Sequence, residues 1–214
     1  MKIVRLLAAS ALVLTASAAR AQGSTVRADS AAFAGAVVFR LRNGPNPLDI
    51  VGNGGGGMVF VAWRENYNAH GYAQVAFYAR GRSIPEDSVL WQLVPFFGGE
   101  RGFDVAQTHM GADCVLVDLR VVRPRRGGPV AVVVGEREHG DSYIAEETVR
   151  FHVYRLETNR DGVPGWPLHR FEHQRTITPT RRYCDINEAF RRELGLGAHG
   201  AVAAEFGSAE AEER

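Results

Sequence analysis

Lysine is almost missing from this chain of 214 residues. The single lysine is Lys2, within a leader that we expect to be cleaved, so the mature protein would contain none. A protein without lysine cannot form a lysine Schiff base, and it cannot build the phosphate-binding loop of a P-loop nucleotide hydrolase. The Ser-x-x-Lys motif of the serine enzymes that react with penicillin is excluded as well.

Other catalytic patterns are also absent from the sequence. There is no Gly-x-Ser-x-Gly, no His-Glu-x-x-His, no His-x-His-x-Asp-His and no Cys-x-x-Cys. Acidic and basic residues nearly balance, with 24 Asp and Glu against 25 Lys and Arg. No basic run is longer than Arg123-x-Arg125-Arg126, so we expect no nucleic-acid partner.

The first residues have the pattern of a secretory signal peptide, which we place at residues 1–21. Lys2 and Arg5 precede a short apolar stretch, and Ala19-Arg20-Ala21 forms a small-x-small cleavage site. The apolar stretch is too short to span a bilayer, and no cysteine for lipid attachment follows it. We therefore predict a periplasmic protein without a membrane span in its mature chain.

The chain contains two cysteines, Cys114 and Cys184. In an oxidising compartment a disulfide is the natural interpretation, and two buried free thiols are the alternative. Such a bond would close a loop of about 70 residues, which is worth roughly 4 kcal/mol in the chain-entropy account of disulfide stabilisation.

Short β patterns recur along the chain after residue 34. Several segments are apolar throughout or alternate apolar with polar residues, which is typical of strands: 37–41, 58–63, 74–79, 89–96, 103–108, 114–122, 130–135, 148–156 and 168–177. Turn clusters such as Asn43-Gly44-Pro45 and Asp161-Gly162 separate them. This pattern predicts an all-β antiparallel sandwich or meander.

One helix is expected, at residues 185–195. Asp185 is a candidate N-cap with Glu188 three residues later, and Gly195 is a candidate stop. We predict a single all-β domain over residues 34–196 that includes this helix. The flanking residues 22–33 and 197–214 are small and polar, or rich in Ala, Gly and Glu, and we expect them to be flexible or disordered.

One loop has part of a calcium-binding pattern. Glu157, Asn159 and Asp161 occupy positions 1, 3 and 5, but Leu168 replaces the acidic residue at position 12. We expect no cofactor in the protein. At this loop the alternatives are a bound calcium ion and a plain turn between two strands. His169 and His173 would share one face of a strand about 13 Å apart, which is too far for both to bind one ion.

Two polar segments follow apolar strands. RENYNAH, residues 64–70, comes after MVFVAW, and EREHGDS, residues 136–142, comes after VAVVV. Polar clusters at the ends of buried strands can be ion-pair networks that complete the rim of a sandwich. They can equally line a ligand site, since binding groups favour loops held by a rigid scaffold.

The chain resembles the CarG-type carbapenem self-resistance proteins, periplasmic proteins that protect carbapenem-producing enterobacteria from their own antibiotic. The similar segments include AWRENYNAHGY (62–72), GEREHGDSY (135–143), NPLDIVGNG (46–54), LWQLVPFF (90–97), GADCVLVDLR (111–120), DGVPGWPL (161–168) and YCDINEAFRRELGL (183–196). The resemblance implies an all-β protein that gives tolerance without being a recognised β-lactamase. Glycines replace the Asp-rich version of the loop near residue 53, which argues against calcium there.

Because the two polar segments recur together in this resemblance, we expect them to meet in space. Arg64 would pair with Glu136 or Glu138, and Arg137 with Glu65, as a structural network. The expected ligand-facing groups are Asn66, Asn68, His70, Asp141 and Ser142. An arginine can grip the carboxylate of a β-lactam, and Asn or His can donate to its carbonyl.

The expected function is tolerance to carbapenems by a non-hydrolytic mechanism, either binding the drug or shielding a cell-wall enzyme. One alternative is a hydrolase that uses Glu65 or His70 as general base. Another alternative is a structural or interaction module of the envelope without a small ligand. A homodimer is compatible with each of these.

Overall fold

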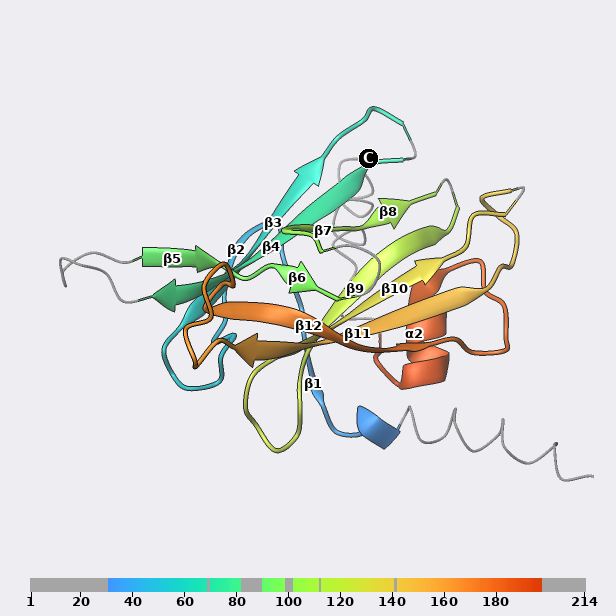
Figure 1. Cartoon of the computed structure of the whole chain (residues 1–214). Coiled ribbons are helices and arrows are strands. Elements are labelled where there is room, and N and C mark those ends of the chain that lie inside the picture. The colour runs from blue at the N-terminus through green and yellow to red at the C-terminus, as the bar shows by residue number, and fades with distance from the viewer. Residues whose placement is uncertain are drawn as a thin grey trace, which may run out of the picture.

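Two stacked β-sheets and a C-terminal helix make up most of the described chain in the computed structural model, which describes residues 31–68, 70–81, 90–98, 102–111, 113–140 and 142–197 (Figure 1). The expected all-β fold with a C-terminal helix is confirmed. The proposed signal peptide, residues 22–30 and the tail after residue 197 lie outside the described residues. No described helix is long and apolar enough to cross a membrane.

The larger sheet has seven strands in the order β1-β9-β10-β11-β12-β6, with β8 beside β9. Its neighbouring strands are antiparallel except for the short parallel pair of β12 and β6. The strands are β1 (Val37–Phe39), β6 (Phe96–Phe97), β8 (His109–Met110), β9 (Val115–Arg123), β10 (Ala131–Arg137), β11 (Val149–Thr158) and β12 (His169–Ile177).

The smaller sheet has five strands in the order β2-β3-β4-β5, with β7 beside β4. All of its pairs are antiparallel. The strands are β2 (Gly44–Pro47), β3 (Gly57–Arg64), β4 (Tyr72–Gly81), β5 (Leu90–Leu93) and β7 (Ala106–Gln107). The long strands β3 and β4 cover the inner face of the larger sheet.

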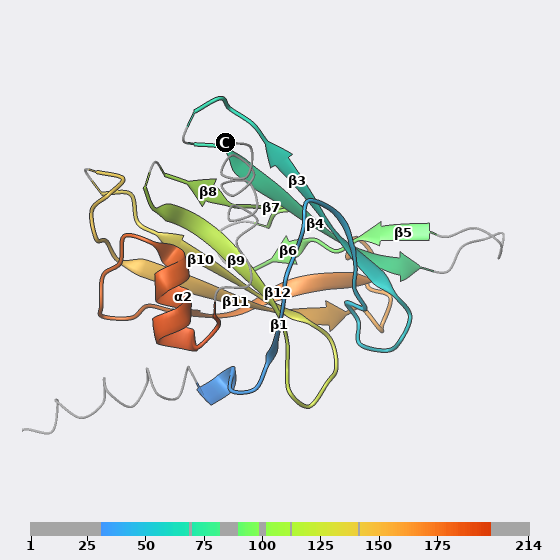
Figure 2. The ribbon, with the colours of Figure 1, turned by 180° about the vertical axis from the view of Figure 1, so that it is seen from behind.

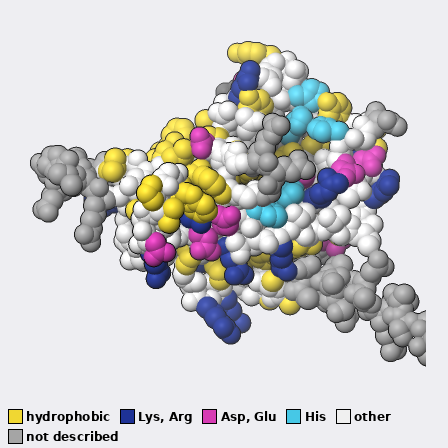
Figure 3. Space-filling view, in the orientation of Figure 1, with side chains coloured by type: hydrophobic (Ala, Val, Ile, Leu, Met, Phe, Trp, Pro, Cys, Tyr) yellow, Lys and Arg dark blue, Asp and Glu magenta, His cyan; other side chains and the backbone are white. Residues whose placement is uncertain are grey.

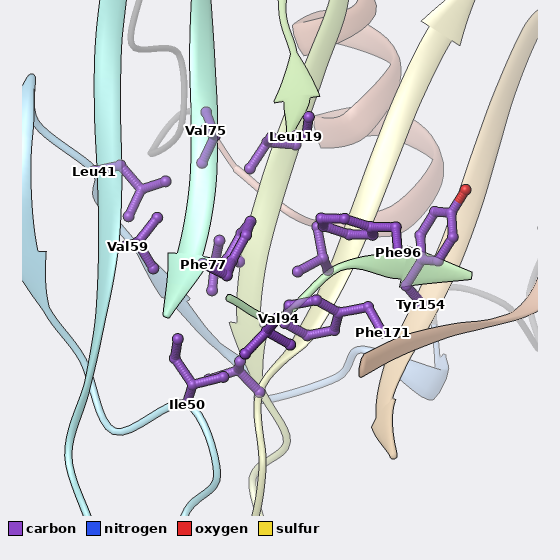
Figure 4. Packing of buried hydrophobic residues seen from close by; sticks show 14 of the residues in the cluster. Leu41, Ile50, Val59, Val75, Phe77, Val94, Phe96, Leu119, Tyr154 and Phe171 are labelled. Atoms are coloured by element: carbon purple, nitrogen blue, oxygen red, sulfur yellow. The ribbon is translucent and has the colours of Figure 1, made fainter. Parts of the chain in front are cut away.

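The main core lies between the two sheets, and aromatic rings fill its centre (Figure 4). The Phe77 ring contacts Phe96 and Phe171 edge-on, at centroid distances of 5.6 and 5.0 Å. Tyr154 meets Phe96 in the same way at 5.1 Å. Edge-to-face pairs of this kind are worth about 0.5–1.5 kcal/mol beyond their buried area, so these rings fix how the sheets stack.

A second core lies on the opposite face of the larger sheet, under helix α2 (Ile186–Leu194) (Figure 2). Asp185 caps the helix by accepting hydrogen bonds from the backbone N–H groups of Asn187 and Glu188, and Gly195 ends it in the left-handed conformation. Both predicted caps are confirmed. A Cβ on Gly135 would come within 2.7 Å of the Phe190 ring, so glycine lets the helix approach β10.

A buried ion pair joins the larger sheet to the helix. Arg120 and Asp118, both on β9, have 0% and 2% of their side chains exposed, and Arg120 Nη1 lies 2.8 Å from Asp118 Oδ2. The other guanidinium nitrogen donates to Asn187 Oδ1 at 2.6 Å, and the guanidinium lies 4.4 Å from the centre of the Phe190 ring. Every partner of this charge therefore comes from β9 or the helix.

The predicted disulfide between Cys114 and Cys184 is present, with a separation of 70 residues along the chain. It ties the start of β9 to the residue before the helix cap. Asp185 Oδ2 also accepts a hydrogen bond from Val115 N at 3.0 Å, so two links hold the helix entrance to the same strand.

Some predicted boundaries were wrong. The cluster Asn43-Gly44-Pro45 was expected to be a turn, but residues 44–47 form the edge strand β2. Proline is tolerated there because an edge strand leaves some N–H positions unpaired. The expected strand at 89–96 divides into β5 and β6, and the one at 103–108 shrinks to β7.

We predict that Arg120→Ala destabilises the protein strongly. The variant leaves Asp118 buried and unpaired, and breaking such a pair typically costs about 3–5 kcal/mol. Chemical denaturation with the disulfide intact measures the loss. Arg192→Ala is the control, since this arginine forms an exposed pair with Glu188 on the helix that is worth about 0.3–0.5 kcal/mol. Equal losses in both variants would contradict the role assigned to Arg120.

Candidate functional site

The two sheets diverge at one end of the sandwich. In Figure 1 the end of β3 and the start of β4 rise away from β9, β10 and β11, and β8 lies between them. The chain passes from the smaller sheet to the larger one at this point, since β7 pairs with β4 and β8 pairs with β9. The buried Thr108 holds the crossing by exchanging two 2.9 Å hydrogen bonds with the Ala73 backbone.

The first polar segment forms a tight loop between β3 and β4 at this diverging end. Asn66 donates to the carbonyl of His70 at 2.9 Å, and Asn68 Oδ1 accepts from His70 N at 2.8 Å. Glu65 accepts from Trp63 Nε1 at 3.1 Å and from Tyr67 N at 2.6 Å. The two asparagine side chains therefore satisfy backbone groups of the loop, whereas the sequence predicted that they face a ligand.

The second polar segment divides between the two faces of the larger sheet. Alternate residues of a strand point to opposite faces. Arg137, 3% exposed, therefore lies on the helix side, where its guanidinium donates to the carbonyls of Ala145 and Ser142. Glu136 and Glu138 lie on the inner side. Arg150 contacts both, at 4.0 Å from Glu136 and in a closer pair with Glu138.

The predicted ion pairs between the segments are wrong. Arg64 is exposed, donates to the hydroxyl of Tyr72 and lies 5.2 Å from the centre of its ring. Glu136 and Glu138 have Arg150 instead of Arg64, because Arg150 is the cross-strand neighbour of Glu136 on β11. Arg137 cannot reach Glu65, since it faces the other side of the sheet.

The two segments nevertheless meet, through rings rather than through ion pairs. The His70 ring lies 4.9 Å from the Tyr143 ring and 6.4 Å from the His109 ring. His139 lies 5.6 Å from His109 and 6.1 Å from Tyr143. His70 Nδ1 is 3.3 Å from the carbonyl oxygen of Met110, which ties this cluster to β8. We call His70, His109, His139 and Tyr143 the ring cluster.

A second polar group lies beside the ring cluster on the inner face of the larger sheet. His152 Nε2 is 3.1 Å from Glu136 Oε1, and the His152 and His173 rings are 5.7 Å apart. In Figure 3 histidine side chains gather in two groups on this face of the molecule. His70, His109, His139, His152 and His173 therefore line one end of the sandwich, whereas His169 lies at the other end, against Thr158.

The surroundings favour the neutral form of two of these histidines, His109 and His173. Burial lowers the pKa of His109, and the neighbouring His139 and His70 lower it further. Burial likewise lowers the pKa of His173, with His152 adding to the effect. The hydrogen bond from His152 lowers the pKa of Glu136, which therefore stays ionised. At neutral pH this end therefore offers the neutral imidazoles of His109 and His173 and the ionised carboxylate of Glu136.

A cleft of about 410 Å³ opens at this end, lined by Asn66, His70, Tyr72, Gln107, Thr108, His109 and Val117. A larger cleft of about 750 Å³ lies at the opposite end, where Glu157, Asn159 and Asp161 are among the lining residues. There the amide of Asn159 is hydrogen-bonded to Val163 N, Val163 O and Trp166 O. We take the diverging end as the candidate site because both predicted polar segments are brought together there.

The sequence identified only part of this site. His109, Tyr143, His152, His173 and Thr176 were not singled out as ligand-facing residues. The alternation of residues 148–157 places His152 on the face opposite Phe151, but it does not show that the smaller sheet leaves that face open. Of the predicted ligand residues, Ser142 is exposed beside Tyr143, and Asp141 lies outside the described residues.

Comparison with known proteins gives one consistent result. A family model described as "Carbapenem resistance protein CarG-like" matches residues 41–192. A solved structure described as "Crystal structure of CarG" superimposes with a TM-score of 0.60 at 21% sequence identity, covering 76% of this chain and 99% of that one. Among curated proteins, none matches the chain.

We predict that Arg64→Ala folds with nearly wild-type stability, since exposed substitutions usually change it by less than about 0.5 kcal/mol. Arg137→Ala should instead cost about 1.5–3 kcal/mol, because it removes a charged donor from two carbonyl groups. Denaturant midpoints of the two variants, measured side by side, test the assignment. A larger loss for Arg64→Ala would restore the ion-pair network predicted from the sequence.

We also predict that stability decreases as the pH falls below about 6.5, the ordinary pKa of histidine. The folded pKa of His109 is depressed, so the unfolded chain binds more protons in this range and is favoured by acid. Melting temperatures from about pH 8 to pH 5 should fall less steeply for His109→Asn than for the wild type. Identical slopes would show that the cluster does not carry this effect.

Proposed function

The chain belongs to the CarG-like family of carbapenem resistance proteins, and from that premise we propose that it gives tolerance to carbapenems by binding the drug in the periplasm without hydrolysing it. The observation that carries the proposal is the meeting of the two polar segments at the diverging end, with the His70 and Tyr143 rings 4.9 Å apart. The leader predicted at residues 1–21 supports the periplasmic location.

The diverging end has the groups that a carbapenem requires. The drug carries a carboxylate, a lactam carbonyl and an apolar bicyclic ring. Arg64 has five N–H donors and reaches the hydroxyl of Tyr72, a residue of the 410 Å³ cleft. Its guanidinium is therefore placed to take the carboxylate, and the half-exposed His70 and His109 can donate to the carbonyl.

The environment of Glu65 favours binding over hydrolysis by a Glu65 base. Its hydrogen bonds from Trp63, and then from Tyr67, lower the pKa of this carboxylate, which makes it a weaker base. Both of its oxygens are engaged by these donors. A general base works best with a pKa near the operating pH, so Glu65 is poorly suited to activate water at neutral pH.

Shielding of a cell-wall enzyme is the second mechanism consistent with the family. Exposed aromatic side chains that such a partner could cover include Trp91 and Trp166, about half exposed. These side chains would equally suit a second copy of the chain. The drug-binding mechanism is preferred because His70, which lines the polar cleft, is also the residue that contacts Tyr143 next to the second segment.

We predict that expression of the full chain in a carbapenem-sensitive host raises the inhibitory concentration, and that deletion of residues 2–21 abolishes this effect. Arg64→Ala and His70→Ala should fold and lose most of the tolerance. The matched control is Arg126→Ala, since this exposed arginine lies in the turn between β9 and β10 at the other end of the sandwich. Full tolerance in both site variants would contradict the proposed location.

Experiments with the purified mature protein distinguish binding, hydrolysis and shielding of a target. Calorimetry with a carbapenem should give a binding isotherm, and the absorbance of the ring should persist when the drug is in large excess. Loss of that absorbance at catalytic protein concentrations would indicate a hydrolase. Absence of both binding and hydrolysis, in a protein that still gives tolerance, would favour shielding of a target.

A further inference from the structure

Four side chains form a hydrogen-bonded chain across β10, β11 and β12 on the inner face of the larger sheet. Glu136 Oε1 lies 3.1 Å from His152 Nε2, and His152 Nδ1 lies 3.1 Å from Thr176 Oγ1. Thr176 Oγ1 is also 3.1 Å from His173 Nε2. A carboxylate, an imidazole and a hydroxyl thus follow one another in the order that activates a hydroxyl group for nucleophilic attack.

The ionised carboxylate fixes the direction of every proton in this chain. A carboxylate only accepts, so His152 Nε2 carries the proton and His152 Nδ1 presents its lone pair. The Thr176 hydroxyl then donates to His152 Nδ1. Thr176 Oγ1 is left to accept the N–H of His173. His152 Nδ1 is therefore placed to accept the hydroxyl proton, and the His173 N–H lies beside the reacting oxygen.

The strand pairing makes this arrangement rigid while leaving the hydroxyl accessible. Thr176 and His152 are direct cross-strand partners, and Glu136 lies on the next strand. Thr176 is exposed, and 25% of the His152 side chain is exposed. A site built on strands holds its groups more accurately than one built on loops, and solvent reaches both the hydroxyl and the imidazole here.

We propose that Thr176 is the residue that a β-lactam acylates, so that the protein retains the drug as a covalent ester. The inference rests on the proposed function, because it names how the bound drug is held. Thr176 Oγ attacks the lactam carbonyl carbon as its proton moves to His152. The carbonyl carbon–nitrogen bond breaks, and His152 passes the proton to the lactam nitrogen. Nothing leaves, so the protein gains the full mass of one drug molecule.

The same two strands supply a matched control. Thr158 Oγ1 lies 3.1 Å from His169 Nδ1, which reproduces the threonine–histidine contact at the other end of the sandwich. Within the described part of the chain, the His169 imidazole contacts no carboxylate. Thr158 therefore contacts an imidazole that no carboxylate orients, and we expect Thr158 not to react.

Intact-mass spectrometry of the mature protein with excess meropenem tests the proposal. We expect one added drug mass in the wild type and in Thr158→Val, none in Thr176→Val, and an adduct again in Thr176→Ser. Glu136→Gln should slow labelling by roughly 10²-fold, the usual contribution of a positioned acid or base. Trypsin cleaves after Arg175 and Arg181, so fragmentation of the 176–181 peptide distinguishes Thr176 from Thr178 and Thr180.

The outcomes separate this inference from the proposed function. No adduct, or an adduct that persists in Thr176→Val, overturns the inference. Calorimetry on the same Thr176→Val sample then reports on the proposed function alone: reversible binding of the drug leaves that function standing, and no binding to either the variant or the wild type removes both. A circular dichroism spectrum like that of the wild type excludes misfolding of the variant.

Discussion

The buried charge of Arg120 is the constraint on which the arrangement of the larger sheet depends. A guanidinium with no exposed surface needs its partners inside the protein, and here they include Asp118, Asn187 and the Phe190 ring. The first lies beside it on β9, and the other two lie on the helix. These contacts stabilise the observed register of the helix on the sheet, and the nearby disulfide holds the helix entrance. The helix thus covers the outer face of the sheet over β9 and β10, and the two predicted polar segments meet on the other side.

The inner face of the larger sheet is apolar in the middle and polar at one end. Phenylalanine rings join the sheets in the middle, so β3 and β4 pack closely there. Beyond those rings the sheets diverge, and the positions that continue the inward pattern are occupied by Glu136, His152 and Thr176 rather than by apolar residues. The strands thus continue past the core, and their polar residues form the hydrogen-bonded chain from Glu136 through His152 to Thr176.

The fold was largely predictable from the sequence because it depends on local signals. The alternation of apolar and polar residues predicted most of the strands, and Asp185 and Gly195 predicted the two ends of the helix. The edge strand β2 was missed because its Gly and Pro residues have turn chemistry, and only its pairing with β3 makes it a strand. The meeting of the two polar segments was foreseen, but their partners were not. Because side chains alternate along a strand, Arg137 faces the helix and Glu136 faces the inner side of the sheet. The resemblance could not show which face is open.

The histidine side chains at the diverging end report directly on whether the drug binds there. Nitrogen-15 spectra of the imidazole side chains, recorded as a carbapenem is added, compare both ends of the protein in one sample. We expect shifts at His70, His109 and His152, with His169 unchanged as the internal reference. Shifts confined to His169, or none at saturating drug, would contradict this expectation.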